Sequence, residues 1–293
     1  MNPSTLSEET AGHRIDSHTV LYGVIGDPIR HSKSPIMMNR AFRETGVNGV
    51  YAAYHITSDK LADFIGGVRA MGIRGVNVTI PHKLDIMKHM DAIDPGAEAI
   101  GAVNTIVNDN GRLTGYNTDG IGYVRSLKEE AEPAIAGKRI VVIGAGGASR
   151  GIVYALAGEK PASITIANRT EDRARELAQS FSSLAELRAV TYDGLQEACR
   201  DADIVINTTS VGMHPHTDAS PVEAGWLKQD AVASDLIYNP LKTKFLQQAE
   251  QAGCRIHGGL GMFIYQGAYA FEYWTGQTAP VAAMRETVLA SLI

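Results

Sequence analysis

Short apolar runs of β type alternate with helical patterns along most of the chain. In its first part the strand candidates are Val20–Ile25, Val50–His55, Gly75–Thr79 and Val103–Val107. Helical patterns fall between them, for example at Pro35–Thr45 and Leu61–Met71. The segment from Asn108 to Gly111 predicts a hairpin turn, because Asn-Gly readily adopts the positive φ that such turns need. The alternation indicates an α/β protein with mainly parallel sheets.

The alternation resumes after a long helical pattern, Gly120–Glu132, which ends near Pro133. A new α/β unit opens at Lys138, and its strand candidates are Arg139–Ile143, Ser163–Ala167, Ile204–Asn207, Ala231–Asp235 and Arg255–His257. The sequence closes with two helical segments, Gly261–Thr275 and Val281–Ser291. We therefore predict two α/β domains, with a boundary near residue 119 and a return near residue 258. One comprises residues 18–118 and 259–293, and the other residues 119–258.

Composition narrows the class of protein. A chain of 293 residues, 44% hydrophobic and 20% charged, is normal for one large or two ordinary globular domains. A net charge of -5 without a Lys/Arg run does not favour nucleic acid as a partner. No apolar run approaches the length of a membrane span. Met1–Ser17 is rich in Ser, Thr and Glu and lacks the apolar core of a secretory signal, so we interpret it as a disordered, mobile extension. The two cysteines, Cys199 and Cys254, lie in unrelated contexts, which fits a reducing compartment and a cytoplasmic location.

A glycine-rich loop follows the strand candidate Arg139–Ile143. Gly144 suits a tight turn, and Gly146 lets the backbone approach a pyrophosphate closely. The helix that follows offers free N–H groups and a positive dipole end to phosphates. The usual G-x-G-x-x-G spacing would place a third glycine where Ser149 stands, with Gly151 two residues later. Because strand and helix flank the loop, nucleotide binding is favoured over a purely structural turn.

The next strand candidate bears on the cofactor. NAD-binding folds usually carry an acidic residue at this strand tip to bind the ribose 2′-hydroxyl. Here the tip is Asn168-Arg169-Thr170, with Arg173 one turn further. Arginine suits a 2′-phosphate, which its planar fork of donors can grip, so NADP is preferred. The alternative is that both arginines are solvated residues at a helix start.

Polar residues cluster near the predicted strand ends of the first domain. Ser32 and Ser34 lie at or before a helix start, where hydroxyls cap a helix or bind a carboxylate. Asn104 lies in an apolar run and, if buried, serves as a structural anchor or a ligand contact. Taken alone, Lys83 would be a solvated lysine and Asp119 a helix N-cap. With Asn77 and Thr79, however, they form a polar group where α/β sheets bind ligands, and Lys83 and Asp119 are a candidate acid/base pair.

In its motifs and their order, the sequence resembles the shikimate dehydrogenase family over nearly the whole chain after about His18. The matching motifs, in order, are Ser32-Lys33-Ser34, Asn77-Val78-Thr79-Ile80-Pro81-His82-Lys83, Gly101-Ala102-Val103-Asn104-Thr105, Asn117-Thr118-Asp119-Gly120, Gly144-Ala145-Gly146-Gly147-Ala148-Ser149-Arg150, Asn168-Arg169-Thr170, Asn207-Thr208-Thr209-Ser210-Val211-Gly212-Met213, Gly258-Gly259-Leu260-Gly261-Met262 and Gln266. The resemblance implies NADPH-dependent reduction of 3-dehydroshikimate to shikimate, a step of aromatic amino-acid biosynthesis. It also implies a substrate domain, a Rossmann-type NADP domain and an active site in the cleft between them.

The resemblance also implies roles for individual residues. Lys83 matches the catalytic lysine and Asp119 its partner. The substrate would be held by Ser32 and Ser34 at its carboxylate and by Asn77, Thr79, Asn104, Asp119 and Gln266 at its ring hydroxyls, with Tyr238 nearby. The cofactor would be held by Gly144, Ala145, Gly146, Gly147 and Ala148 at the pyrophosphate, by Asn168, Arg169, Thr170 and Arg173 at the 2′-phosphate ribose, and by Leu236, Gly259 and Met262 near the nicotinamide.

Two alternative functions stay open. One is a quinate/shikimate dehydrogenase of the same superfamily that uses NAD or both cofactors. The other is a non-catalytic NADP-binding regulator of the same fold, although such a sensor has no need of the pair Lys83 and Asp119. The oligomeric state stays open between monomer and homodimer. His214-Pro215-His216 offers too few ligands for a metal site, so we expect a loop there and no metal.

Overall fold

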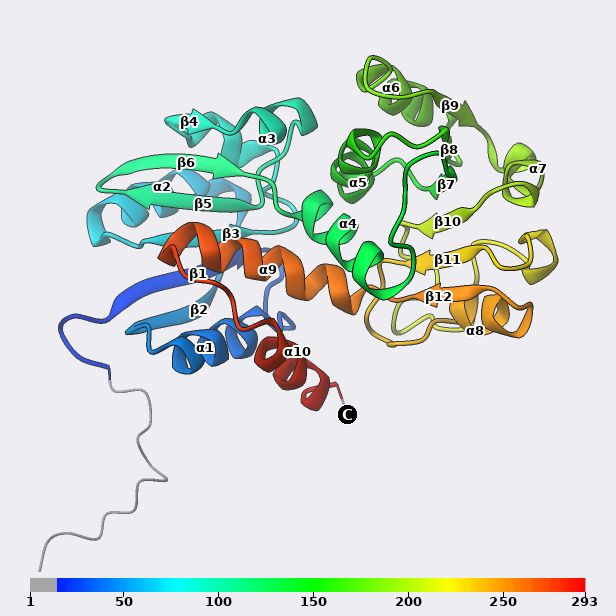
Figure 1. Ribbon diagram of the computed structural model, residues 1–293. Coiled ribbons are helices and arrows are strands. Elements are labelled where there is room, and N and C mark those ends of the chain that lie inside the picture. Colours follow the sequence, from blue (N-terminus) through cyan, green and yellow to red (C-terminus); the bar gives the residue numbers. More distant parts are fainter. Residues whose placement is uncertain (1–14, 293) are drawn as a thin grey trace, which may run out of the picture.

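The computed structural model describes residues 15–292 of the chain, and of Ala224 only the backbone (Figure 1). Most of the predicted mobile extension, residues 1–14, lies outside the described residues. Its last part does not fit the prediction, because Asp16 is fixed to the folded protein. Asp16 accepts hydrogen bonds from the His18 N–H at 2.9 Å and from Asn48 Nδ2 at 3.0 Å.

The described chain forms two six-stranded sheets with helices around them, which confirms the predicted α/β class. The first sheet has the strand order β2-β1-β3-β5-β6-β4. Its strands are β1 (Val20–Gly26), β2 (Gly49–His55), β3 (Gly75–Val78), β4 (Ala92–Ile93), β5 (Thr105–Asp109) and β6 (Arg112–Tyr116). The pairings of β1 with β2 and β3 and of β4 with β6 are parallel, whereas β5 runs antiparallel to β3 and β6. The antiparallel strand follows from the hairpin, in which Asn110 and Gly111 have φ of 52° and 93°.

Two strand ends in this sheet differ from the prediction. The strand expected at Val103–Val107 begins at Thr105, because the Val103 N–H bonds to the Lys83 carbonyl oxygen instead of a neighbouring strand. The strand expected to reach Thr79 ends at Val78. The helices around the sheet are α1 (Ser34–Thr45), α2 (Leu61–Met71) and α3 (Pro95–Ile100), with one-turn 3₁₀ segments at Ser58–Lys60 and Asp85–His89.

The second sheet is parallel throughout, in the order β12-β11-β10-β7-β8-β9. Its strands are β7 (Arg139–Ile143), β8 (Ser163–Ala167), β9 (Leu187–Val190), β10 (Ile204–Asn207), β11 (Val232–Asp235) and β12 (Arg255–His257). Its helices are α5 (Gly147–Gly158), α6 (Glu171–Ser180), α7 (Leu195–Arg200) and α8 (Lys244–Gln251), with short 3₁₀ segments at Tyr192–Gly194 and Ala224–Trp226. Strand β9 was not predicted; it lies at the sheet edge, only half-buried, so its sequence lacks a continuous apolar run.

Helices α4 (Asp119–Glu130) and α9 (Leu260–Thr275) lie between the two sheets, and α10 (Val281–Ala290) packs beside α1 (Figure 1). Helix α4 belongs to the core of the second sheet, where its Tyr123 and Leu127 are fully buried. Helix α9 belongs to the core of the first sheet, and Trp274 Nε1 donates to the Ile106 carbonyl oxygen of β5 at 2.9 Å. The two helices pack directly on each other and so connect the two cores.

Candidate active site

The turn after β3 brings Lys83 to the start of α4. The strand ends at Val78, and the backbone then turns so that the Lys83 carbonyl oxygen accepts the Val103 N–H at 2.9 Å. Lys83 Nζ lies 2.6 Å from Asp119 Oδ2, and these side chains are 23% and 11% exposed. Asp119 is the first residue of α4 and does not act as its N-cap, a position that Thr118 occupies. The predicted acid/base pair is therefore in contact and still reaches solvent.

Asn104 fixes the other side of the Asp119 carboxylate. Its Nδ2 donates to Asp119 Oδ1 at 2.8 Å and to Thr118 Oγ1 at 3.0 Å. Its Oδ1 accepts from the Thr118 N–H at 2.8 Å and from Thr105 Oγ1 at 2.9 Å. With 2% exposure and every polar atom bonded, Asn104 serves as a structural anchor. Its predicted contact with substrate stays a prediction.

A second chain of buried polar groups leads from β3 toward α1. Asn77 Nδ2 donates to Thr105 Oγ1 at 3.1 Å, and Asn77 Oδ1 accepts from the Tyr51 hydroxyl at 2.7 Å. Burial raises the pKa of the Tyr51 phenol well above its ordinary value, and its contact with Ser34 lowers it in part. The hydroxyl of Ser32 accepts the Ser34 N–H at 3.2 Å, a cap-like contact although Lys33 holds the N-cap position. The sequence pattern gave no signal for Tyr51, because its partners come from other segments.

The segment after β11 carries Tyr238 close to the start of α9. The Tyr238 ring stacks on Phe263 with a centroid distance of 4.9 Å, and Gln266 Nε2 donates to the Phe263 carbonyl oxygen at 2.8 Å. A Cβ on Gly259 would lie 2.0 Å from the Leu236 carbonyl oxygen, so only glycine permits this approach. The segment that carries Leu236 and Tyr238 thus lies against Gly259 and the first turns of α9, which carry Gln266.

Asp235 holds this segment in place, a role that the motif did not reveal. Its Oδ1 accepts from the Ile237 N–H at 3.0 Å and from Asn207 Nδ2 at 3.1 Å, and its Oδ2 from Thr243 Oγ1 at 2.7 Å. Burial raises the pKa of the Asp235 carboxyl to about 6, although these hydrogen bonds oppose the rise. The only signal in the sequence was a carboxylate at the end of an apolar strand.

The glycine loop between β7 and α5 turns tightly at Gly144 and leaves the start of the helix open. Gly144 has φ of 110°, and a Cβ on it would lie 2.6 Å from Thr208 Oγ1. By contrast, a Cβ on Gly146 or Gly147 would meet nothing within 4 Å, so the helix start faces open space. Ser149 at the third motif position is buried, and its hydroxyl accepts the Gly146 N–H at 3.1 Å. Serine therefore stabilises the loop where the usual pattern has glycine.

The tip of β8 presents exposed arginines. Asn168 Nδ2 donates to the Thr170 carbonyl oxygen at 2.8 Å and so shapes the turn into α6. Arg169 and Arg173 are exposed, and within residues 15–292 neither guanidinium has a hydrogen-bond or ion-pair partner. Both are free to grip an anion beyond the end of the strand.

Models of protein families match three parts of the chain. The model described as the shikimate dehydrogenase substrate binding domain matches residues 24–106. The model of shikimate / quinate 5-dehydrogenase matches residues 126–234, and that of the shikimate 5'-dehydrogenase C-terminal domain matches residues 259–289. The shikimate dehydrogenase (NADP(+)) of Geobacillus sp. (strain WCH70) is 48% identical over 272 residues, which are 93% of this chain and 98% of the relative. The chain belongs to the shikimate dehydrogenase family.

Solved structures of the family share the whole fold. A shikimate dehydrogenase in complex with NADP+ has a TM-score of 0.90 and 42% sequence identity, with 96% of this chain and 98% of that chain covered. The shikimate 5-dehydrogenase of Listeria monocytogenes, in complex with shikimate and NAD, has a TM-score of 0.89 and 40% identity, with 94% and 98% covered. These likenesses confirm the predicted architecture of an N-terminal substrate domain and a Rossmann-like domain.

In the described part of the chain, no group of three or more His, Cys, Asp and Glu residues could hold a metal ion. Residues 214–216 form a loop, as predicted. No helix among residues 15–292 is long and apolar enough to cross a membrane.

Proposed function

We propose that this chain catalyses the reversible NADP-linked reduction of 3-dehydroshikimate to shikimate. The observation that carries the proposal is the ion pair of Lys83 with Asp119, which joins the turn after β3 to the start of α4 and stays open to solvent. The naming of the relatives as NADP-dependent shikimate dehydrogenases supports the reaction and the cofactor. The proposed place in metabolism is the biosynthesis of aromatic amino acids.

The proposed division of labour follows the two sheets. Residues 18–118 and 259–293 would bind the substrate, and residues 119–258 would bind NADP. The burial of α4 with the second sheet and of α9 with the first supports boundaries near 119 and 258. We also propose a cytoplasmic location and a monomer or homodimer; both described cysteines are free and buried, which suits a reducing compartment.

The residues at the second sheet fit a dinucleotide with a 2′-phosphate. The open space at Gly146 and Gly147 admits a pyrophosphate against the start of α5, with Gly144, Ala145 and Ala148 completing the cradle. The free guanidinium groups of Arg169 and Arg173, with Asn168 and Thr170, would hold the 2′-phosphate. Leu236, Gly259 and Met262 would border the nicotinamide, and the bound cofactor would supply the hydride.

The proposed substrate residues are Ser32 and Ser34 for the carboxylate and Asn77, Thr79, Asn104, Asp119, Tyr238 and Gln266 for the ring. In reduction, Lys83 would donate a proton from Nζ to the oxygen at C3 as that carbon accepts the hydride. In oxidation, the neutral Lys83 amine would take the hydroxyl proton. Asp119 and Asn104 would keep Nζ in place, because the carboxylate bonds Lys83 through one oxygen and Asn104 through the other. General acid–base help of this kind is worth ~10²–10⁴ in rate.

The second candidate is a quinate/shikimate dehydrogenase with relaxed cofactor use. One family model names both substrates, and the Listeria monocytogenes structure holds NAD. The exposed arginines at the β8 tip favour NADP for this chain. A non-catalytic regulator remains a weaker alternative, because it would need no Lys83–Asp119 pair.

An absorbance assay at 340 nm on the purified full chain tests the proposal. We expect reduction of NADP⁺ with shikimate, and a higher kcat/KM for shikimate with NADP⁺ than for quinate or with NAD⁺. A higher kcat/KM for quinate would favour the second candidate. Intact ligand binding without any absorbance change would support the regulator.

A further inference from the structure

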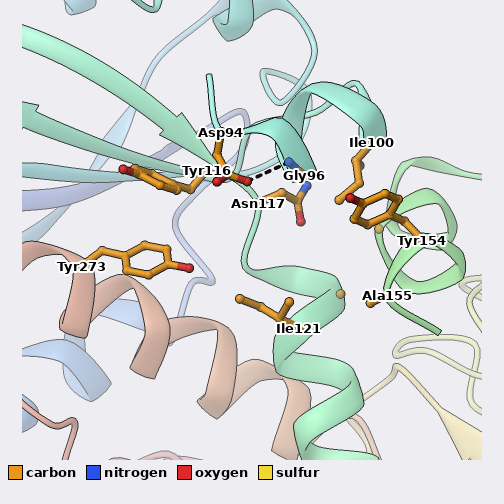
Figure 2. A pocket seen from close by; sticks show the side chains of 11 residues that line it. Asp94, Gly96, Ile100, Tyr116, Asn117, Ile121, Tyr154, Ala155 and Tyr273 are labelled. Carbon is orange, nitrogen blue, oxygen red and sulfur yellow. Dashed lines mark hydrogen bonds between the residues drawn. The ribbon is translucent and has the colours of Figure 1, made fainter. Parts of the chain in front are cut away.

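A separate cavity of about 120 Å³ lies where α3, β6, α4, α5 and α9 meet (Figure 2). Its lining comes from helices α3, α4, α5 and α9 and from the end of β6, and none of its residues belongs to the proposed substrate or cofactor set. Figure 2 shows Tyr154 of α5 across the space from Tyr116 and Tyr273, with Ile121 of α4 between them. The shape of the cavity therefore depends on how the elements around the first sheet pack against those around the second.

The lining combines three tyrosine side chains with one carboxylate. The rings of Tyr116 and Tyr273 contact each other with a centroid distance of 4.8 Å. Asp94 Oδ2 caps α3 by accepting the N–H groups of Gly96 and Ala97, whereas its Oδ1 has no hydrogen-bond partner within residues 15–292. Burial, and next the charge of Asp94, raise the pKa of the Tyr273 phenol, so this negative charge reaches the aromatic wall. Electron-rich tyrosine rings and a carboxylate together attract a cation.

The size of the cavity limits what it can hold. One water needs ~10–15 Å³, so about 120 Å³ exceeds a single solvent site. Pockets that bind drug-sized ligands measure ~300–1,000 Å³, so this cavity is too small for a ligand of that size. A compact organic cation with few heavy atoms fits between these limits.

Asn117 connects this cavity with the candidate active site. It lines the cavity, and its Oδ1 accepts the Asp119 N–H at 3.1 Å while its Nδ2 donates to the Ala102 carbonyl oxygen at 3.0 Å. Asp119 in turn bonds Lys83. A ligand that displaces the Asn117 side chain must therefore change the hydrogen bonding of the residue that orients the lysine.

We propose that this cavity is an effector site for a compact organic cation, held by Asp94 and the tyrosine faces and coupled to Asp119 through Asn117. The probe is tetramethylammonium chloride, titrated into the full chain by calorimetry. Controls are tert-butanol, a compact neutral molecule, and sodium chloride at equal ionic strength. We expect saturable binding of the cation alone.

Two variants and one control locate the binding. Asp94→Asn removes the charge and keeps a good N-cap, and should weaken binding at least about tenfold because a charged partner is lost. Ile121→Trp fills the space from a side chain that is 38% exposed and should abolish binding. Asp193→Asn at an exposed position outside the cavity is the matched control and should bind like the original chain. Absence of saturable binding by the original chain, or binding by Asp94→Asn or Ile121→Trp that is as tight as that of the original chain, would overturn the proposal.

The coupling has its own readout, which does not depend on any enzymatic activity. The amide resonance of Asp119 should shift as tetramethylammonium saturates the cavity, and should stay fixed in Ile121→Trp. Binding without a shift at Asp119 would overturn the effector role. A failed shikimate assay would leave both readouts intact, so the two proposals can fail separately.

Discussion

Lys83 and Asp119 stand 36 positions apart in the sequence, yet their side chains meet at 2.6 Å. The motifs predicted which residues carry the chemistry, because lysine and aspartate follow recognisable strand and helix boundaries. They did not reveal that Asn104 bonds the free oxygen of the carboxylate, or that Tyr51 bonds Asn77. These partners depend on contacts between segments that no local pattern encodes.

At the residue scale, Lys83→Ala should lower kcat by ~10²–10⁴ while the dissociation constant of NADP stays nearly unchanged. The reason is that the proton at Nζ is needed at the reacting oxygen and not at the proposed cofactor site. Steady-state kinetics and a fluorescence titration of NADPH measure the two quantities. Near-normal turnover by the purified variant would refute the role of Lys83.

Also at the residue scale, the double variant Arg169→Ala/Arg173→Ala should lower kcat/KM for NADP⁺ by ~10–100-fold, because hydrogen bonds to charged groups are lost. Activity with NAD⁺ should change little, since NAD lacks the 2′-phosphate. Arg188→Ala, at another exposed arginine of the same sheet, serves as the matched control. An equal loss with both cofactors would contradict a 2′-phosphate site.

At the element scale, the sequence motif at the glycine loop has two separate uses. Gly144, with φ of 110°, shapes the loop, whereas Gly151 lies where α4 packs on α5. A Cβ on Gly120 would lie 2.1 Å from the Gly151 carbonyl oxygen, so the two helices are in backbone contact. The close approach requires glycine at position 120, whereas a Cβ on Gly151 would meet its neighbours at ordinary contact distances of 3.4 Å or more.

Gly120→Ala should therefore lower the free energy of unfolding by ~1–3 kcal/mol, the usual cost of overpacking. Gly66→Ala is the matched control, because a Cβ there meets nothing within 4 Å on α2. It should raise stability by ~0.5–1 kcal/mol through helix propensity alone. Urea unfolding curves measure both, and similar midpoints for the two variants would show that α4 and α5 can separate freely.

At the scale of the whole molecule, a buried hydrogen-bond chain fastens α4 to the second sheet. The Tyr123 hydroxyl and Ser234 Oγ lie 2.8 Å apart, and Ser234 Oγ lies 2.8 Å from His257 Nδ1. Ser126 Oγ completes the chain at 2.7 Å from His257 Nε2. Burial, and next the charge of Arg285, lower the pKa of the His257 imidazole to about 4.

The low pKa of His257 makes stability depend on pH. The unfolded chain protonates this histidine near 6.5 and the folded chain only near 4, so its contribution is full above 6.5 and is lost as pH falls to 4. The loss is on the order of 3 kcal/mol, from about 1.4 kcal/mol per pKa unit. His257→Gln should remove this part of the dependence in urea unfolding between pH 7 and 4.

Asp235 acts in the opposite direction, because its raised pKa of about 6 makes its contribution fall as pH rises from 3.8 to 6. Asp235 is present both in His257→Gln and in the unchanged chain, so its contribution cancels in the difference between their free energies of unfolding. His216→Gln, at an exposed loop position, is the control. Parallel pH profiles for the chain with and without His257 would contradict a buried neutral imidazole.

The sequence by itself determined the α/β class, most element positions and the chemistry-bearing motifs, because strand periodicity, glycine turns and helix starts are local properties. Strands β7, β8, β10 and β12 match their predicted bounds, and the first three of them are largely buried apolar runs. Only the tertiary structure decided that Asn104 anchors Asp119, that Asp235 holds the Tyr238 segment and that a cavity lies behind Asn117. These features arise where segments distant in the chain pack together, and packing is decided by all of those segments at once.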